Sequence, residues 1–384
     1  MSVKKSKAII ALGSNLGDRL EYLQKAVVLV EQETIRIKAF SSLFESPAWG
    51  FEGASFYNSC IAVETVLSPF ELMQKLAAVE LFLGRKRKQN ATTYINRTVD
   101  LDLLLYEDES FDFPELTLPH PLFHLRNFVL YPLIEIASHW IHPNFNKSIR
   151  VLKEECPDNS ICKRLPLEWW TPPIFKFFSF IAVEGNIGAG KTTLSNKIAQ
   201  RFDVPIIEEA FSKNPHLADF YQDSDRFALA VETFFVEDRA KQLQSFTKHH
   251  QGPFIADYMF EKSIVFASLT LKEKDFKQFE KKCKALQSQR ISPDIVVYLE
   301  TELEQLKKQI KQRGRLYEQN IDEDYLLSVE QKYKQFFKAN PNYPILILPT
   351  KGLDFENKES DFQQIIRSIY RFGILKKYPK PQSP

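Results

Sequence analysis

The sequence has few cysteines, no long apolar run and nearly balanced charge. Its four cysteines, Cys60, Cys156, Cys162 and Cys283, form neither a Cys-x-x-Cys pair nor a Cys/His cluster with zinc spacing. We therefore expect no disulfide framework and a reducing compartment, which favours the cytoplasm. The lack of any run of about 18 apolar residues argues against a transmembrane helix, and the first apolar stretch ends too soon for a signal peptide. A formal net charge of +2 gives no electrostatic reason to expect nucleic acid or a membrane surface as a partner.

The composition is that of an ordinary globular protein, and the length suits two domains. The chain has 384 residues, of which 44% are hydrophobic and 26% charged, and domains usually hold about 100–200 residues. We expect a first domain over 1–162 and a second over 179–375. Between them, residues 163–178 contain three prolines and two tryptophans, and predict a linker that packs on a domain. The basic, proline-rich segment 376–384 predicts a disordered tail.

Hydrophobic periodicity predicts a mixed α/β chain. In the first domain it indicates strands at 7–12, 35–43, 59–66 and 100–106, a helix through Leu20, Leu23, Val27 and Val30, and a second helix from Ser68-Pro69 to Leu83. In the second domain it indicates apolar strands at 177–183, 253–256, 295–299 and 345–348. Long helical stretches separate these later strands, a pattern typical of a doubly wound parallel sheet.

One motif in the second domain points directly to phosphate binding. Residues 185–192 fit G-x-x-x-x-G-K-[ST] between a predicted strand and a predicted helix, the context that distinguishes a P-loop from a chance glycine-rich turn. Its glycines let backbone N–H groups face phosphate oxygens, while Lys191 can reach the β/γ-phosphates of ATP and Thr192 can hold Mg²⁺. No Asn-Lys-x-Asp guanine motif is present, which disfavours a GTPase. The residues expected to bind ATP here are Gly185, Asn186, Ile187, Gly188, Ala189, Gly190, Lys191, Thr192 and Thr193.

Around this motif, residues 178–372 resemble the deoxynucleoside kinase family. The matching segments, in order, are Glu184-Gly185-Asn186-Ile187, Glu208-Glu209, Asn214-Pro215-x-Leu217, Phe220-Tyr221 and Arg313-Gly314-Arg315-Leu316-Tyr317-Glu318. The resemblance implies that Glu209 acts on the 5′-hydroxyl and that Arg313 and Arg315 close on the transferred phosphate. It further implies catalytic positions at Lys191 and Asp257, sugar contacts at Tyr221 and Glu318, and base contacts at Glu232 and Arg239. Taken alone, the two arginines would suit a solvated helix end and Glu209 a surface position.

The second domain departs from the family after its third strand. Tyr258 follows Asp257 where the family usually has arginine, and Glu232 stands where many members have glutamine. If a helix follows Asp257, Lys262 shares a face with Tyr258, so we expect Lys262 to restore the charge and Tyr258 to line the sugar pocket. The alternative is a regulatory module that binds nucleotide without kinase turnover.

In the first domain, two carboxylates carry the chemical signal. Asp100 and Asp102 are two positions apart in a predicted strand, so their side chains share a face. Such a pair suits Mg²⁺, which binds carboxylates together with substrate phosphates, and Arg85, Arg87 and Arg97 are near in sequence. On these residues alone, an exposed strand face with alternating charge is the favoured interpretation.

Residues 6–160 resemble hydroxymethyl-dihydropterin pyrophosphokinase. The matching segments are Ala11-Leu12-Gly13-Ser14-Asn15-Leu16-Gly17, Phe56-Tyr57-Asn58, Glu80-x-x-x-Gly84-Arg85-x-Arg87, Arg97-Thr98-Val99-Asp100-Leu101-Asp102 and Leu118-Pro119-His120-Pro121. The resemblance implies Mg²⁺ at Asp100 and Asp102, and pterin contacts at Pro47, Asn58 and Phe128. It assigns the triphosphate to Arg85, Arg87, Arg97, His120 and Arg126, although His120 beside two prolines would also suit a structural histidine. Tyr94-Ile95-Asn96 replaces the family's Trp-Gly-Pro on a loop.

Together these patterns predict a bifunctional transferase. The expected fold is a ferredoxin-like α/β sandwich followed by a P-loop domain with a parallel sheet. The expected reactions are pyrophosphoryl transfer from ATP to hydroxymethyl-dihydropterin and 5′-phosphorylation of deoxynucleosides, with ATP and Mg²⁺ as cofactors. The expected partners are small-molecule substrates, together with a second copy of the chain if it dimerises as kinases of this family often do.

Overall fold

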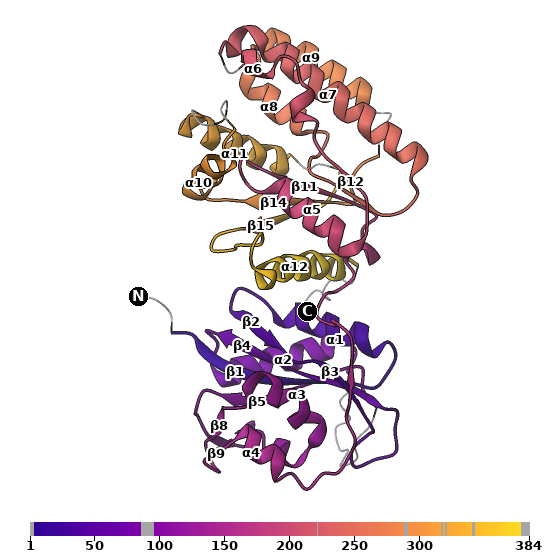
Figure 1. The fold of residues 1–384 in the computed structure, drawn as a ribbon, viewed down its shortest axis with the longest axis vertical. Helices are drawn as coiled ribbons and strands as arrows, with labels where there is room; N and C mark the ends of the chain where they lie inside the picture. The colour runs from indigo at the N-terminus through magenta and orange to yellow at the C-terminus, as the bar shows by residue number, and fades with distance from the viewer. Residues whose placement is uncertain are drawn as a thin grey trace, which may run out of the picture. The chain divides into compact units, whose positions relative to one another are not determined.

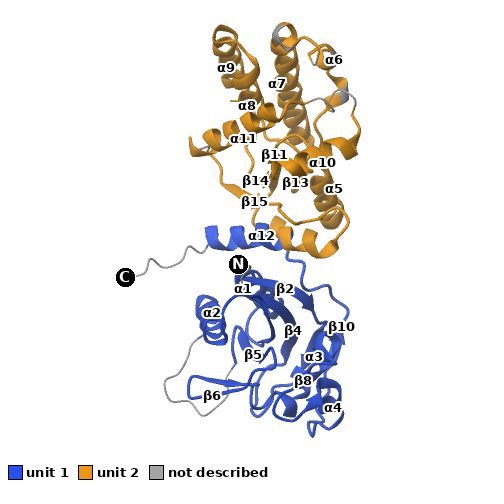
Figure 2. Ribbon diagram, turned by 90° about the vertical axis from the view of Figure 1, so that its left-hand side faces the viewer, with its two compact units in different colours: residues 1–172, 366–384 blue, residues 173–365 orange. Residues whose placement is uncertain are grey.

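The computed structural model describes residues 4–85, 96–220, 222–287, 291–315, 318, 321–339 and 342–377. The chain is a mixed α/β protein with two main sheets (Figure 1). It divides into two compact units, residues 1–172 with 366–384, and residues 173–365 (Figure 2). Among the described residues, no helix is both long and apolar enough to cross a membrane.

An antiparallel sheet forms the centre of the first unit. Its strands run in the order β10-β3-β4-β1-β5, and β2 also pairs with β4. Every described pairing in this sheet is antiparallel. Its strands are β1 (Ser6–Ser14), β2 (Ile35–Phe40), β3 (Leu43–Ser46), β4 (Phe56–Thr65), β5 (Asp100–Tyr106) and β10 (Lys163–Leu165). The expected strands are therefore present, and the stretch 35–43 divides into β2 and the start of β3.

Helices cover both faces of this sheet, which is why β1 is an almost unbroken apolar run. Ile9, Ala11 and Cys60 pack with Val129 and Leu133 of α3 on one face. Helix α1 contacts β1 and α2 contacts β5, so these two helices cover the other face. The helices of this unit are α1 (Arg19–Val30), α2 (Pro69–Phe82), α3 (Asn127–Ala137) and α4 (Ile149–Glu154), and two small hairpins pair β6 (Phe111–Phe113) with β7 (Leu116–Leu118) and β8 (Ile141–His142) with β9 (Lys147–Ser148).

The segment expected to be a linker begins as part of the first sheet. Strand β10 pairs with β3, with Lys163 opposite Glu45. Further along, Trp169 is buried, and its indole Nε1 donates to the Ser41 carbonyl oxygen at 2.9 Å. The segment therefore packs on the first unit as far as Pro172, and the second unit begins at Pro173.

The second unit contains the expected parallel sheet. Its strands lie in the order β12-β13-β11-β14-β15, and all four described pairings are parallel. They are β11 (Phe180–Gly185), β12 (Ile206–Ile207), β13 (Phe254–Ala256), β14 (Ile295–Glu300) and β15 (Ile345–Pro349). The helices are α5 (Lys191–Phe202), α6 (Leu217–Phe220), α7 (Ser224–His249), α8 (Lys262–Thr270), α9 (Glu273–Gln287), α10 (Leu303–Arg313), α11 (Glu323–Lys338) and the first part of α12 (Glu359–Lys377), whose residues from 366 onward belong to the first unit. Helix α12 thus runs two residues into the expected tail, and 378–384 lie outside the described residues.

The parallel arrangement brings three strand ends to one edge of the sheet. Ala182 of β11 and Val296 of β14 pack with Val236 of α7 and Tyr333 of α11 in one core. Helices α7, α8 and α9 lie side by side (Figure 1). The P-loop follows β11, while short loops follow β12 and β13 at the same edge, where open α/β sheets bind ligands.

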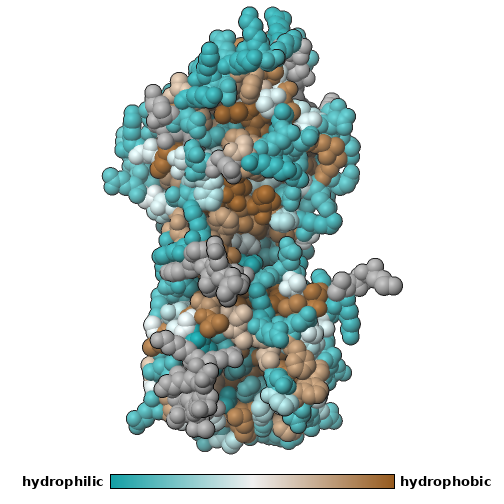
Figure 3. All heavy atoms as spheres, turned by 180° about the vertical axis from the view of Figure 1, so that it is seen from behind, coloured by the Kyte–Doolittle hydropathy of each residue, from teal (hydrophilic) through white to brown (hydrophobic). Residues whose placement is uncertain are grey.

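The surface is mostly polar. On the face seen in Figure 3, hydrophilic residues cover most of the molecule, and hydrophobic residues form separate patches between them. On this face, apolar side chains are therefore dispersed among polar ones rather than gathered into one large patch.

Candidate active sites

The first cavity lies over the centre of the antiparallel sheet. Gly13 of β1 is opposite both Asn58 of β4 and Asp100 of β5 in the strand register. Because Gly13 has no side chain, the space between these two polar groups stays open. The aromatic residues Trp49 and Phe56 contribute to the cavity wall. The expected site residues that line it are Pro47, Asn58, Arg97, Asp100, Asp102, Arg126 and Phe128.

Asp100 and Asp102 lie on the same face of β5, as the sequence predicts. Arg85 Nη1 lies 2.6 Å from Asp100 Oδ1, and Arg97 Nη1 lies 2.5 Å from Asp100 Oδ2. Burial, followed by the charges of Asp100 and Glu80, raises the pKa of Asp102 to about 7. A buried carboxylate beside two others is a site where a divalent cation would relieve the repulsion.

The donor set therefore fits Mg²⁺ bound together with a substrate. Within the described parts of the chain, no group of three or more His, Cys, Asp or Glu side chains is placed to hold a metal ion. Mg²⁺ commonly uses one or two carboxylates and takes its other ligands from phosphate and water. Asp100 and Asp102 are the two side chains that would hold it.

One end of the first cavity is aromatic with a single amide. Asn58 Nδ2 donates to Ser46 Oγ at 2.9 Å, which fixes the orientation of the amide. The rings of Trp49 and Phe128 lie 6.4 Å apart, and the Arg126 guanidinium lies 4.6 Å from the Trp49 ring centroid. Trp49 was not among the expected site residues, although its place in the irregular stretch beside Pro47 was the available signal.

Two residues expected to bind the triphosphate, Arg85 and His120, do not line the first cavity. Arg85 reaches it only through Asp100 and also pairs with Glu80. Burial, with Arg126 as the next cause, lowers the pKa of His120 to about 4, so its imidazole is neutral at physiological pH. Arg87 lies outside the described residues.

The second cavity, of about 790 Å³, begins at the P-loop. Gly188 and Gly190 have φ angles of +82° and +87°, which glycine adopts without strain. Lys191 Nζ donates to the carbonyl oxygens of Gly185 at 3.0 Å and Asn186 at 2.9 Å. Burial, followed by the charge of Lys262, lowers the pKa of Lys191 to about 8. The P-loop residues that line this cavity are Ile187, Gly188, Gly190, Lys191, Thr192 and Thr193, while Gly185, Asn186 and Ala189 are not part of its lining.

Asp257 connects the P-loop to the loop after β12. Its Oδ2 accepts from Thr192 Oγ1 at 2.6 Å, and its Oδ1 accepts from the Glu209 backbone N–H at 2.8 Å. One carboxylate therefore fixes both the hydroxyl expected to bind Mg²⁺ and the position of Glu209.

Glu209 lies between two cations. Arg239 Nε donates to its Oε1 at 3.0 Å, and Lys262 Nζ donates to its Oε2 at 2.6 Å. Burial alone would raise the pKa of Glu209, but Lys262 and Arg239 outweigh burial and lower the pKa to about 2. Glu208, by contrast, is exposed and accepts from Asn196 Nδ2 at 2.6 Å. The geometry thus distinguishes the two neighbouring glutamates.

The expectation for Tyr258 is wrong, because helix α8 begins only at Lys262. Tyr258 precedes the helix, is fully buried, and donates from its hydroxyl to Gln242 Oε1 at 3.1 Å. It therefore belongs to the core and does not line the cavity. Lys262 does line the cavity, and its contact with Glu209 places a cation there. It does so from the start of α8 and not from a helix face shared with Tyr258.

The remaining expected residues lie farther along the same cavity. Glu318 is 1% exposed, and its Oε1 lies 3.0 Å from Arg315 Nη1 and 3.7 Å from Arg313 Nη1. Glu232 and Arg239 of α7 line the cavity with Phe235, whereas Tyr221 lies outside the described residues. The aromatic walls Phe211, Phe220, Phe235 and Phe266 were not predicted as site residues. For Phe235, the available signal was its spacing from Glu232 and Arg239 on one face of α7.

Comparisons with known proteins divide the chain in the same way as its two cavities. Residues 181–373 match the family described as Deoxynucleoside kinase, and residues 9–138 match the family described as 7,8-dihydro-6-hydroxymethylpterin-pyrophosphokinase (HPPK). Deoxyguanosine kinase from Bacillus subtilis (strain 168) is 35% identical over 197 residues, which are 50% of this chain and 95% of that protein.

A second relative and a solved structure complete the comparison. The 2-amino-4-hydroxy-6-hydroxymethyldihydropteridine pyrophosphokinase of Aquifex aeolicus (strain VF5) is 40% identical over 153 residues, 40% of this chain and 91% of that protein. A structure of deoxyadenosine kinase from M. mycoides with bound dCTP has a TM-score of 0.44 and 24% identity, and the match covers 50% of this chain and 98% of that one. Each half of the sequence is thus similar to nearly the full length of a separate curated protein.

Proposed function

Because the chain belongs to the deoxynucleoside kinase family through residues 181–373 and to the HPPK family through residues 9–138, we propose that it is a bifunctional transferase. The first unit transfers pyrophosphate from ATP to hydroxymethyl-dihydropterin, and the second phosphorylates deoxynucleosides at the 5′-hydroxyl. The sheet order β5-β1-β4-β3, with α1 and α2 as crossovers, supports a ferredoxin-like fold for the first unit.

In the first reaction the hydroxymethyl oxygen attacks the β-phosphorus of ATP, and AMP leaves. Phe128 and Trp49 hold the flat pterin ring, while Asn58 hydrogen-bonds its edge. Pro47 completes the wall of this pocket. Bound Mg²⁺ would supply positive charge to the phosphates at Asp100 and Asp102.

The arginines of the first unit complete its charge balance. Arg97 and Arg126 line the cavity and bind the triphosphate. Arg85 acts through its ion pair with Asp100. Positively charged side chains at these positions offset the charge that builds up as the pyrophosphoryl group transfers.

In the second reaction the nucleoside 5′-oxygen attacks the γ-phosphorus of ATP, and ADP leaves. Lys191 and the P-loop backbone hold the phosphates, and Arg313 and Arg315 approach the transferred group. Because its pKa is about 2, the Glu209 carboxylate is a weak base. Its main role is therefore to orient the 5′-hydroxyl, and not to remove the hydroxyl proton before the attack. That role suits phosphoryl transfer, in which the transition state needs positioning and charge neutralisation. Glu318 receives the sugar hydroxyl.

The argument for the alternative, a regulatory module without turnover, is that Tyr258 replaces the family's arginine. Lys262 weakens this argument because it supplies a buried cation 2.6 Å from Glu209. The observation that carries the kinase proposal is the connection of P-loop Thr192 through Asp257 to Glu209 within one cavity.

The nucleotide product tests the proposal directly. Full-length protein is incubated with ATP, Mg²⁺ and either hydroxymethyl-dihydropterin or each of the four deoxynucleosides, and AMP and ADP are separated by chromatography. We expect AMP with the pterin and ADP with at least one deoxynucleoside. Absence of ADP with all four nucleosides, alongside normal AMP with the pterin, would instead support the regulatory alternative.

A further inference from the structure

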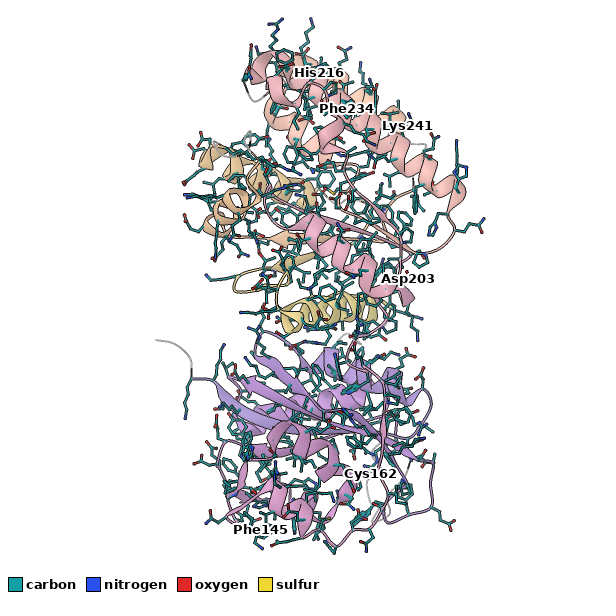
Figure 4. All side chains as sticks on the ribbon, in the orientation of Figure 1. Phe145, Cys162, Asp203, His216, Phe234 and Lys241 are labelled. Atoms are coloured by element: carbon teal, nitrogen blue, oxygen red, sulfur yellow. The ribbon has the colours of Figure 1, made fainter. Side chains whose placement is uncertain are left out.

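The far end of the kinase cavity has a chemistry that identifies the part of the nucleoside it receives. Phe211, Phe220, Phe235 and Phe266 contribute aromatic walls there. Phe234 and Lys241, labelled in Figure 4, lie on α7 on either side of the stretch that carries Phe235 and Arg239. The base is the flat apolar part of a nucleoside, so this end suits the base, while the P-loop end suits the phosphates.

Glu232 presents a carboxylate to this aromatic end. It is 4% exposed and lines the cavity from α7. Its Oε1 is 3.4 Å from Thr270 Oγ1, a long hydrogen bond, and its Oε2 has no hydrogen-bond partner among the residues that the structure describes. A buried carboxylate with so little hydrogen bonding is costly unless a ligand completes it.

Arg239 adds donors next to that carboxylate. A guanidinium has five N–H donors. Two nitrogens of Arg239 donate to Glu209, and Nη1 donates to Ser263. Within the described part of the chain, two N–H groups therefore remain for an acceptor on the ligand.

We propose that Glu232 selects the base: its ionised carboxylate accepts from the adjacent N1–H and 2-amino groups of guanine, and its protonated form favours bases that present a donor beside an acceptor. Guanine is the natural base that offers two adjacent donors, and its O6 is an acceptor for Arg239. Adenine and cytosine offer an amino donor beside a ring nitrogen acceptor, which would face an ionised carboxylate with a lone pair. This inference rests on the proposed kinase function.

The surroundings of Glu232 allow both of its protonation states. Burial raises the pKa of Glu232 to about 7, with Arg239 opposing that rise. The other groups that face it are Thr270 and Lys262 of α8, Glu209 after β12, and Cys283 of α9. Glu209 stays ionised with a pKa of about 2, and burial holds the pKa of the Cys283 thiol at about 12, so it stays neutral. The ionised fraction of Glu232 therefore increases as the pH rises through neutrality.

The test compares kcat/KM for deoxyguanosine, deoxyinosine and deoxyadenosine in the full-length chain, with ADP formation as the readout. Deoxyinosine keeps N1–H but lacks the 2-amino group. We expect the wild type to prefer deoxyguanosine over deoxyinosine by roughly tenfold to a hundredfold. Glu232→Gln, which offers one donor and one acceptor in the same shape, should reduce that preference to within about threefold and improve deoxyadenosine relative to deoxyguanosine.

The pH dependence of selectivity supplies a second readout. The wild-type ratio of deoxyguanosine to deoxyadenosine should rise between about pH 6 and about pH 8.5, because Glu232 ionises in that range. The ratio should be flat in Glu232→Gln, which retains Lys262 and every other titrating group. Glu237→Gln is the matched control, since this α7 glutamate is 54% exposed in its ion pair with Lys282; it should behave as the wild type does.

An unchanged selectivity in Glu232→Gln, a pH-independent ratio in the wild type, or a wild-type preference for deoxyadenosine across the pH range would each overturn this inference. In those cases the kinase function would stand, because the nucleosides are still phosphorylated. Failure of the wild type to phosphorylate any of the three nucleosides, or any other deoxynucleoside, would overturn the kinase function itself and this inference with it.

Discussion

At the scale of single residues, the second cavity depends on how Glu209 is held. Its carboxylate is 6% exposed and contacts Arg239 and Lys262 on different helices, while its backbone N–H donates to Asp257. Three side chains from separate elements therefore fix its direction. This degree of constraint is what a group that orients a reacting hydroxyl requires.

Replacement of Glu209 by glutamine should slow transfer far more than it weakens ATP binding. We expect kcat to fall by about 10²- to 10⁴-fold, the usual contribution of such a group, with KM for ATP nearly unchanged. Because Glu209 remains ionised at a pKa of about 2, it should add no acidic limb to the wild-type pH profile above about pH 4. The exposed neighbour gives the control: a larger loss of kcat in Glu208→Gln than in Glu209→Gln would contradict the assignment.

Removal of the second cation tests how the chain compensates for its missing arginine. In Lys262→Met, Glu209 loses a charged hydrogen bond, and kcat should fall by roughly 10- to 100-fold, since such bonds contribute about 1.5–3 kcal/mol. The pKa of Glu209 should rise, which would move an acidic limb of kcat toward neutral pH. Lys262→Arg should recover part of the rate. Tyr258→Phe changes only a core hydroxyl and should keep wild-type kinetics; unaltered kinetics in Lys262→Met would rule the role out.

At the scale of secondary structure, the sites are set by strand register and strand ends. In the first unit, β1 places Gly13 between Asn58 and Asp100. A Cβ built on Gly13 would lie 3.3 Å from Asn58 Oδ1 and 3.9 Å from the Asp100 Cβ. The strand thus supplies the floor of the first cavity by lacking a side chain at one position.

Gly13→Ala should therefore impair pterin binding without unfolding the sheet. The added methyl group presses on the Asn58 amide, so we expect KM for the pterin to rise by about 3- to 30-fold, as small displacements in a binding site can cause. Steady-state AMP formation measures this effect. ADP formation by the same protein is the internal control and should not change. An unaltered KM for the pterin would contradict the prediction, because it would show that the added methyl group does not reach the bound substrate or the Asn58 amide.

Element by element, the sequence predicts what is buried better than what is exposed. The runs at 180–183 and 295–299 are recognisable because both faces of a parallel strand are covered. Strand β10 was missed because Lys163 and Arg164 are exposed and join the sheet through their backbone. The start of α8 was misplaced because its first residue follows a turn with no side-chain cap. The position of Tyr258 was therefore predicted wrongly as well.

At the scale of the whole molecule, each compact unit has its own sheet and its own cavity. The motif residues predicted the P-loop and the Asp100/Asp102 face because short-range spacing sets both. The aromatic walls Trp49 and Phe266 could not be predicted in the same way. In a sequence, an aromatic residue that lines a pocket cannot be distinguished from one that fills a core. Their roles depend on packing between distant segments.

The central claim is that one chain contains two independent ATP-dependent active sites, and one experiment tests it most directly. Full-length wild type, Lys191→Ala and Asp102→Asn are each supplied with ATP, Mg²⁺, the pterin and the best deoxynucleoside in one mixture, and AMP and ADP are measured together. Lys191→Ala removes the charge proposed to bind phosphate in the second cavity only, and Asp102→Asn removes a carboxylate proposed to bind Mg²⁺ in the first only. The account predicts loss of ADP alone in the first variant and loss of AMP alone in the second. Loss of both products in either variant, with thermal unfolding unchanged, would contradict it.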